Sequence, residues 1–249
     1  MSPHNLAGGG ALIAHGLVDR PTDDLDAFTR ATGEDFADVA NKVRAAFEAA
    51  NYMVTPDPQS HPSYDVRTWL IQETRTSGRG RRPEIVKIQI YRDSVTRAAA
   101  SSRLGPLVDA QELGANKVVT IYHRSRHRDF DDVARIAPRL GVADMIAMAD
   151  TKMVTPIDRP TLASCFRAIR HLDDDRFPDP GKANDLRVYF HALADRLAGG
   201  VDLIFPSPYE QIWTPVPPSK AALDDRWKKL QTDLEERAGR RRATDDGAL

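Results

Sequence analysis

The chain has 249 residues, 41% of them hydrophobic and 29% charged, so it can bury a core and is not composed like a disordered protein. No apolar run approaches the roughly 18 residues that a membrane span requires, and the single cysteine, Cys165, excludes an internal disulfide. Together these features predict a cytoplasmic protein that does not enter a membrane.

Charge is distributed unevenly along the chain, although the formal net charge is only −1. Between Arg75 and Arg128 there are twelve lysines or arginines and four acidic residues. Such clustering is typical of a surface that binds phosphate groups. A solvated basic face without any ligand would give the same pattern.

Turn-forming residues dominate the N-terminal 24 residues. The runs Gly8-Gly9-Gly10 and Pro21-Thr22-Asp23-Asp24 offer few side chains that could pack. The apolar stretch at residues 6–18 is short and has no basic flank before it, which argues against a secretory signal. We therefore expect residues 1–24 to form a flexible N-terminal arm.

A helix and a β-hairpin are predicted next. Thr32 suits a helix N-cap, apolar residues then recur at helical spacing from Phe36 to Phe47, and Asn51 suits the helix end. Residues 52–54 should be extended. The β-forming stretches 64–74 and 84–91 flank the polar run 76–83, so they predict a hairpin with a basic tip.

Alternating helices and strands are predicted for the rest of the chain. We expect helices over residues 104–113 and 130–140, the first capped by Gly114 and the second ended by Gly141. The continuous apolar run 117–122 predicts an interior strand beside 84–91, and 144–149 predicts another strand. Further expectations are helices at 162–172, 185–197 and 224–238, a strand at 201–205, an extended proline-rich segment at 206–218 and a disordered tail at 239–249.

Four short sequences stand in an order that resembles a known nuclease family. They are Asn51-Tyr52-Met53-Val54, Tyr64-Asp65-Val66, Val86-Lys87-Ile88-Gln89-Ile90-Tyr91 and Gly114-Ala115-Asn116-Lys117-Val118-Val119-Thr120. This order is similar to that of the restriction-endonuclease-like superfamily, in its Mrr-like branch. The resemblance implies a three-layer α/β core with a mixed central sheet over residues 25–165, followed by a mostly helical and proline-rich extension over 166–238.

The resemblance also implies a metal-dependent site for phosphodiester hydrolysis. Asp65 and Gln89 would hold Mg²⁺, since hard cations prefer oxygen ligands. Tyr91 stands where the family has its lysine. Lys87 lies on the same strand face two residues earlier and would stabilise charge on the phosphate. The predicted catalytic residues are thus Asp65, Lys87 and Gln89.

Duplex DNA is the partner that this nuclease hypothesis implies. The predicted contacts to nucleic acid are Arg79, Arg81, Arg82, Arg92, Arg124 and Arg126. His123 and His127 are four residues apart, but three neighbouring arginines argue against a metal site there.

Three functions stay open at this point. The first is a metal-dependent endonuclease in defence or repair, acting as a homodimer or as a subunit of a larger complex. The second is an inactive nucleic-acid-binding or scaffold subunit that keeps the nuclease fold. The third is an unrelated α/β enzyme that acts on a small phosphorylated substrate.

Overall fold

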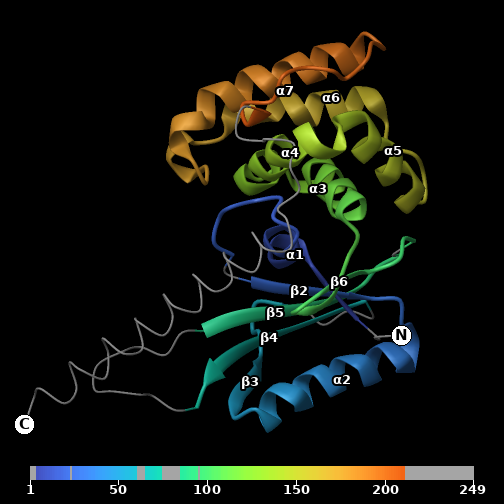
Figure 1. Cartoon of the computed structure of the whole chain (residues 1–249), viewed down its shortest axis with the longest axis vertical. Helices are drawn as coiled ribbons and strands as arrows, with labels where there is room; N and C mark the ends of the chain where they lie inside the picture. Colours follow the sequence, from blue (N-terminus) through green and yellow to red (C-terminus); the bar gives the residue numbers. More distant parts are fainter. Residues whose placement is uncertain (1–3, 23, 61–64, 75–84, 95, 211–249) are drawn as a thin grey trace, which may run out of the picture. The chain divides into compact units, whose positions relative to one another are not determined.

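A mixed seven-stranded sheet carries the fold of the computed structural model, which describes residues 4–22, 24–60, 65–74, 85–94 and 96–210 (Figure 1). The strand order in the sheet is β3-β4-β5-β2-β1-β7-β6. The strands are β1 (Asn5–Ala7), β2 (Asp24–Thr29), β3 (Tyr52–Pro56), β4 (Val66–Glu73), β5 (Ile85–Arg92), β6 (Ala100–Ser102) and β7 (Gly105–Leu107). The α-helices are α1 (Gly8–Ala14), α2 (Gly33–Ala49), α3 (Ala110–Arg124), α4 (His127–Leu140), α5 (Val142–Lys152), α6 (Arg159–Arg167) and α7 (Ala183–Ala198). Three short 3₁₀ helices lie at Ala168–His171, Asp174–Arg176 and Pro180–Lys182.

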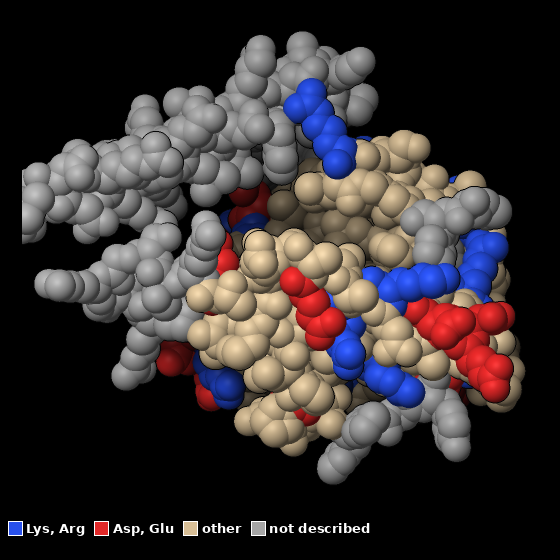
Figure 2. Space-filling view, turned by 90° about the horizontal axis from the view of Figure 1, so that it is seen from below, with Lys and Arg blue, Asp and Glu red and all other residues tan. Residues whose placement is uncertain are grey.

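Helix α2 covers one face of the sheet (Figure 1). Because side chains alternate along a strand, Ile88 and Ile90 of β5 point to this face and pack with Phe36 of α2 and Trp69 of β4. From the α2 side, acidic and basic side chains lie interspersed on the surface (Figure 2). An example is the pair Arg44 and Glu48, one helical turn apart. This face is thus an ordinary solvated helix surface over an apolar core.

The helices α3 to α7 form a layer on the side of the sheet opposite α2 (Figure 1). Its centre is aromatic, with the ring of Phe190 in edge contact with Phe130, Phe166 and Tyr189. The segment after α7 is tied to α4, because Ser207 donates a hydrogen bond to the Ala134 carbonyl at 2.6 Å. Strand β2 joins the two halves of the sheet, since it pairs antiparallel with β1 and parallel with β5.

Several elements confirm the sequence predictions. Thr32 is the N-cap of α2, and Asn51 follows the helix with a left-handed φ of 64°. Strands β4 and β5 pair antiparallel as the predicted hairpin, whose tip lies outside the described residues. Helix α4 ends at Gly141, where φ is 74°. The α/β class, the mixed sheet and the helices α6 and α7 are therefore as expected. The predicted helix at 224–238 and the tail at 239–249 lie outside the described residues.

The predicted interior strand at residues 117–122 is wrong, because these residues belong to α3. Asp109 caps this helix by accepting a hydrogen bond from the Gln111 amide. The β-branched run suggested a strand, but Leu113, Val118 and Ile121 are buried together on one helical face. Gly114, expected as a cap, is a packing position, since a Cβ there would come within 2.7 Å of the Met145 sulfur.

Two neighbouring predictions fail for local reasons. The expected helix at 104–113 begins only at Ala110, because Gly105 has a φ of 98° and opens β7 in a tight hairpin with β6. The expected strand at 144–149 lies in α5, where Val142, Met145, Ile146 and Ala149 are buried at helical spacing. A short apolar run does not distinguish the two structures by itself. No strand forms at 201–205.

The described N-terminal residues 4–22 are not a loose arm. They supply β1 within the sheet and α1 beneath α3, and Ala11, Leu12 and Leu17 are almost completely buried. The small residues that suggested disorder instead allow close packing. No helix among the described residues is long and apolar enough to cross a membrane. The other segment boundaries that we predicted, at residues 165 and 238, stay predictions.

A buried ion network connects the N-terminal segment to α3 and α4. Asp132 of α4 is fully buried and accepts hydrogen bonds from the Arg20 guanidinium at 2.6 and 2.8 Å. Lys117 of α3 lies 2.8 Å from the same carboxylate and 3.4 Å from Asp129. Burial would lower the pKa of Lys117, but the charges of Asp132 and Asp129 outweigh burial and raise it. Lys117 is thus held as a cation inside the protein.

We expect Asp132→Ala to destabilise the protein by about 3 to 5 kcal/mol, because Lys117 and Arg20 would remain buried without this counter-ion. Urea unfolding measures the change. Asp38→Ala is the control, since Asp38 is exposed on α2 and its replacement should change stability by no more than about 0.5 kcal/mol. Equal unfolding midpoints for the two variants would contradict a structural role for the network.

Candidate active site

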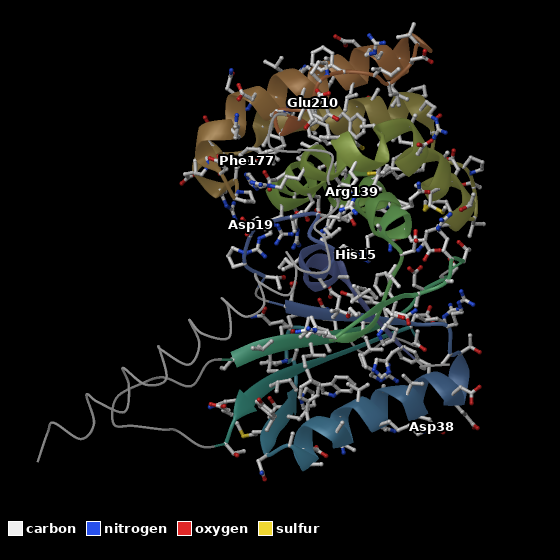
Figure 3. The ribbon with its side chains drawn as sticks, viewed as in Figure 1. His15, Asp19, Asp38, Arg139, Phe177 and Glu210 are labelled. Carbon is white, nitrogen blue, oxygen red and sulfur yellow. The ribbon has the colours of Figure 1, made fainter. Side chains whose placement is uncertain are left out.

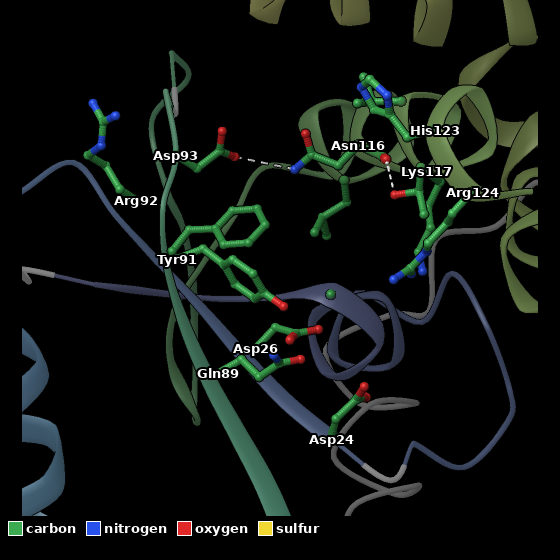
Figure 4. A pocket seen from close by; sticks show the side chains of 15 residues that line it. Asp24, Asp26, Gln89, Tyr91, Arg92, Asp93, Asn116, Lys117, His123 and Arg124 are labelled. Carbon is green, nitrogen blue, oxygen red and sulfur yellow. Dashed lines mark hydrogen bonds between the residues drawn. The ribbon is translucent and has the colours of Figure 1, made fainter. Parts of the chain in front are cut away.

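A pocket of about 410 Å³ lies between the sheet and α3 (Figure 4). Its floor comes from β2 and β5 and its opposite wall from α3. It is lined by Gly8, Asp24, Asp26, Phe28, Gln89, Tyr91, Arg92, Asp93, Leu113, Asn116, Lys117, Val119, Thr120, His123 and Arg124. Its volume falls within the range usual for small-molecule and cofactor sites.

Strand β2 places two carboxylates in this pocket. Asp24 and Asp26 are two residues apart, so the strand period of two directs both to the pocket face. The first residue of α1, Gly8, approaches Asp26 closely, since a Cβ on Gly8 would lie 1.9 Å from the Asp26 Oδ2. Gly8 also has a φ of 56°. Only glycine meets both demands, and this explains the residue at that position.

Burial and the nearby charge of Asp24 act on the Asp26 carboxyl. Together they raise the pKa of Asp26 to about 6, burial being the larger cause, against the opposing effects of Lys117 and Arg124. Burial, followed by the Asp26 charge, raises the pKa of the Tyr91 hydroxyl to about 12. Tyr91 therefore stays neutral at physiological pH, while the pKa of Asp26 lies at about 6. Two acids forced together in this way need a compensating positive charge.

Basic side chains face the carboxylates across the pocket (Figure 4). Lys117 projects from the middle of α3, and its ammonium is fixed by Asp132. Arg124, the last residue of α3, is half exposed and lies 3.3 Å from Asp129. Asp24 and Asp26 therefore face two of the pocket's cations, Lys117 and Arg124, whose positions are set by buried carboxylates of α4.

The chemistry of this donor set fits a divalent cation such as Mg²⁺. Mg²⁺ is usually held by one or two carboxylates and completes its coordination with water and substrate phosphates. Asp24 and Asp26 supply such a pair, and Gln89 stands opposite Asp26 in the parallel β2–β5 register. No cluster of three or more His, Cys, Asp or Glu suited to a metal occurs among the described residues. The candidate metal site among the described residues is therefore the pair of carboxylates Asp24 and Asp26.

The structure separates the residues that the sequence analysis grouped as catalytic. Asp65 is exposed and forms a bidentate ion pair with Arg92, at 2.5 and 2.9 Å. The Lys87 Nζ lies 3.6 Å from the Asp57 Oδ2, and Lys87 is opposite Leu70 in the antiparallel β4–β5 register. Asp65 precedes Leu70 by five residues on the same chain, which is about 17 Å of extended strand. Asp65 and Lys87 thus do not meet around one cavity.

Of the predicted metal ligands, only Gln89 lines the pocket, where its amide donates to Thr68 Oγ1 at 3.2 Å. Among the predicted nucleic-acid contacts, Arg92 and Arg124 line the pocket and Arg126 is exposed just before α4. The remaining three, Arg79, Arg81 and Arg82, lie outside the described residues.

The sequence analysis missed Asp24 and Asp26. The signal was present in Asp24-Leu25-Asp26-Ala27-Phe28, where acids alternate with apolar residues as in a half-buried strand. The preceding glycines and Pro21 suggested instead a loose segment. The pairing of β2 with β5 also could not be read locally, because the two strands are about sixty residues apart in the chain.

Asp26→Asn should stabilise the metal-free protein at pH 7.5 by about 1 to 3 kcal/mol, because the folded state then no longer carries a buried charge. The carboxyl has its ordinary pKa near 4 when unfolded and about 6 when folded, so wild-type stability falls as pH rises through this range. The gain should therefore vanish at pH 4. Thermal unfolding in a chelator measures it, with Asp38→Asn on α2 as the control (Figure 3). A gain of equal size at both pH values would contradict the titration of Asp26.

Comparisons with known proteins identify relatives of this fold. A family model described as "Nucleotidyl transferase AbiEii toxin, Type IV TA system" matches residues 5–229. The solved structure of MenT4, a nucleotidyltransferase toxin from Mycobacterium tuberculosis, has a TM-score of 0.55 at 15% identity, and the match covers 92% of this chain and 82% of that chain. JHP933 from Helicobacter pylori has a TM-score of 0.46 at 15% identity, covering 80% of this chain and 88% of its own. No curated protein matches.

These findings correct the assignment to the restriction-endonuclease-like superfamily. The family match spans almost the whole chain, and the segment 117–122, on which the nuclease resemblance partly rested, is helical. The expectation of a nuclease, endonuclease or hydrolase is therefore wrong. The chain belongs to the AbiEii family of nucleotidyltransferase toxins.

Proposed function

We propose that this protein transfers a nucleotidyl group from a nucleoside triphosphate to a hydroxyl group of an acceptor, with Mg²⁺ as its metal ion. The observation that carries the proposal is the Asp24–Asp26 pair on one face of β2, in a pocket that also holds Lys117 and Arg124. Membership of a nucleotidyltransferase family supports the reaction class.

The reaction exchanges one bond at phosphorus for another. The acceptor oxygen bonds to the α-phosphorus, the bond from this phosphorus to the β-phosphate oxygen breaks, and pyrophosphate and a proton leave. Bound Mg²⁺ would neutralise part of the phosphate charge and polarise the reacting phosphoryl group. Asp24 and Asp26 would hold this ion, as the fit of two carboxylates to Mg²⁺ suggests.

The basic side chains would bind the triphosphate. Lys117 and Arg124 face the carboxylates across the pocket, so a polyanion between the two walls would lie close to positive charge. The ion pair of Lys117 with Asp132 fixes the ammonium before substrate arrives. Preorganised charge of this kind stabilises a transition state more than charge that must first be moved into place.

Toxin activity follows by extension from the family description. A protein that modifies an acceptor needed for growth would arrest the cells that make it, and an antitoxin would be its functional partner. This partner takes the place of the duplex DNA that the nuclease hypothesis implied. The homodimer suggested with that hypothesis stays a prediction.

Asp24→Asn and Asp26→Asn should each reduce nucleotidyl transfer at least about 100-fold, because an amide does not supply the charge that holds the metal ion. The measurement is incorporation of label from α-³²P nucleoside triphosphates into the macromolecules of a cell extract, with Mg²⁺ or with chelator. Growth of cells expressing each variant is recorded in parallel.

Asp38→Asn is the matched control, since it makes the same change on the outer surface of α2 (Figure 3). It should transfer label and affect growth like the wild type. Transfer by the wild type that persists in chelator, or transfer by Asp26→Asn at the wild-type rate, would overturn the assignment of this pair.

A further inference from the structure

The pocket is divided into a charged half and a largely apolar half. Asp24, Asp26, Lys117 and Arg124 occupy one end (Figure 4). The rings of Phe28 and Tyr91 and the side chains of Leu113 and Val119 also line the pocket. The Tyr91 hydroxyl is directed toward Asp26, and Asn116 and Asp93 lie away from this end (Figure 4). A nucleotide is divided in the same way, into charged phosphates and a flat base with a polar edge.

We infer that the Phe28–Tyr91 wall receives the nucleobase of the donor nucleotide and that Asn116, with Asp93 beside it, selects the base; this rests on the proposed function. Phe28 and Tyr91 are opposite each other on β2 and β5, with ring centroids 5.9 Å apart in an edge-on arrangement. Their rings present an aromatic surface beside the charged half. Bases stack on such surfaces whatever their identity, so the wall gives affinity and not selectivity.

The length of the strand suits this placement. Phe28 is two residues beyond Asp26 on β2, and Asp93 is four residues beyond Gln89 on the chain of β5. At a rise of about 3.3 Å per residue, these steps are about 7 and 13 Å. Phosphates held at Asp26 would leave the base beside Phe28 and its polar edge toward Asp93.

Asn116 has a defined orientation at the far end. Its Nδ2 donates to Asp93 Oδ2 at 3.5 Å, and the same oxygen accepts a 2.7 Å hydrogen bond from Lys152. With the amide nitrogen turned to Asp93, the carbonyl oxygen of Asn116 is left to accept a hydrogen bond from a ligand. Hydrogen bonds to a base edge distinguish bases where stacking does not. Asn116 is therefore the residue that determines specificity for the base.

Binding of nucleotides and of inorganic tripolyphosphate tests the two halves separately. Affinities for the four α,β-methylene ribonucleoside triphosphates and for tripolyphosphate are measured by calorimetry with Mg²⁺. Phe28→Leu should weaken all four nucleotides about 5- to 100-fold and leave tripolyphosphate unchanged, because Phe28 carries no polar group toward the charged half. Asn116→Leu should bring the four dissociation constants, which differ in the wild type, to within about threefold of one another.

Tyr52→Leu is the matched control for loss of an aromatic ring. Tyr52 makes an edge-on contact with Phe47 at the same 5.9 Å, but it packs on the α2 side of the sheet, away from the pocket. It should bind every ligand like the wild type.

The outcomes separate this inference from the proposed function. Unchanged nucleotide affinity in Phe28→Leu, an equal loss of tripolyphosphate affinity, or a wild-type ranking of bases in Asn116→Leu would each overturn the base site while the reaction class stands. A wild type that does not discriminate the four nucleotides would overturn the role of Asn116. A wild type that binds neither nucleotides nor tripolyphosphate would overturn the proposed function, and the base site with it.

Discussion

The buried charge of Lys117 is the constraint on which the arrangement of the pocket depends. An ammonium beneath α3 is tolerable only if carboxylates meet it, and Asp132 and Asp129 of α4 do so. Asp132 also binds Arg20, which lies in the segment that connects α1 to β2. One carboxylate therefore fixes the helix that forms the wall of the pocket and the segment that enters its floor. The buried ion network of Lys117, Arg20, Asp129 and Asp132 therefore fixes the position of α3 relative to β2, and with it the width of the pocket.

The close approach of the Gly8 turn to Asp26 is the second constraint. A side chain at Gly8 would overlap the carboxylate, so the first helix can lie over β2 only where the chain carries glycine. The result is a half-buried acid beside a second acid, with a raised pKa and a demand for positive charge. Lys117 and Arg124 meet part of this demand, and a metal ion would meet the rest. The two neighbouring carboxylates thus favour binding of a metal cation, and the cations opposite them favour binding of a polyanion.

The nuclease resemblance failed for a reason that is visible in the hairpin. The resemblance rested on Lys87, Gln89 and Tyr91, which alternate along β5, and on Asp65, which directly precedes the neighbouring strand β4. In this protein Asp65 forms an ion pair with Arg92 at the surface. Gln89 is opposite a different carboxylate, Asp26, on the other neighbouring strand, β2. The alternation of polar residues along β5 was interpreted correctly. The carboxylate beside Gln89, however, is Asp26 of β2 and not Asp65 at the start of β4.

The sequence by itself determined the local elements whose signals are short-range. The helix from Thr32 to Asn51, the β4–β5 hairpin and the end of α4 at Gly141 follow from caps, periodicity and glycine, and these act within a few residues. It also determined that Gln89 and Tyr91 share one strand face. Only the tertiary structure decided that residues 117–122 are helical, because burial on one face of α3 outweighs their β-propensity. It alone brought Asp24 and Asp26 beside Gln89, since pairing between distant strands depends on how the whole sheet is assembled and leaves no local mark on the chain.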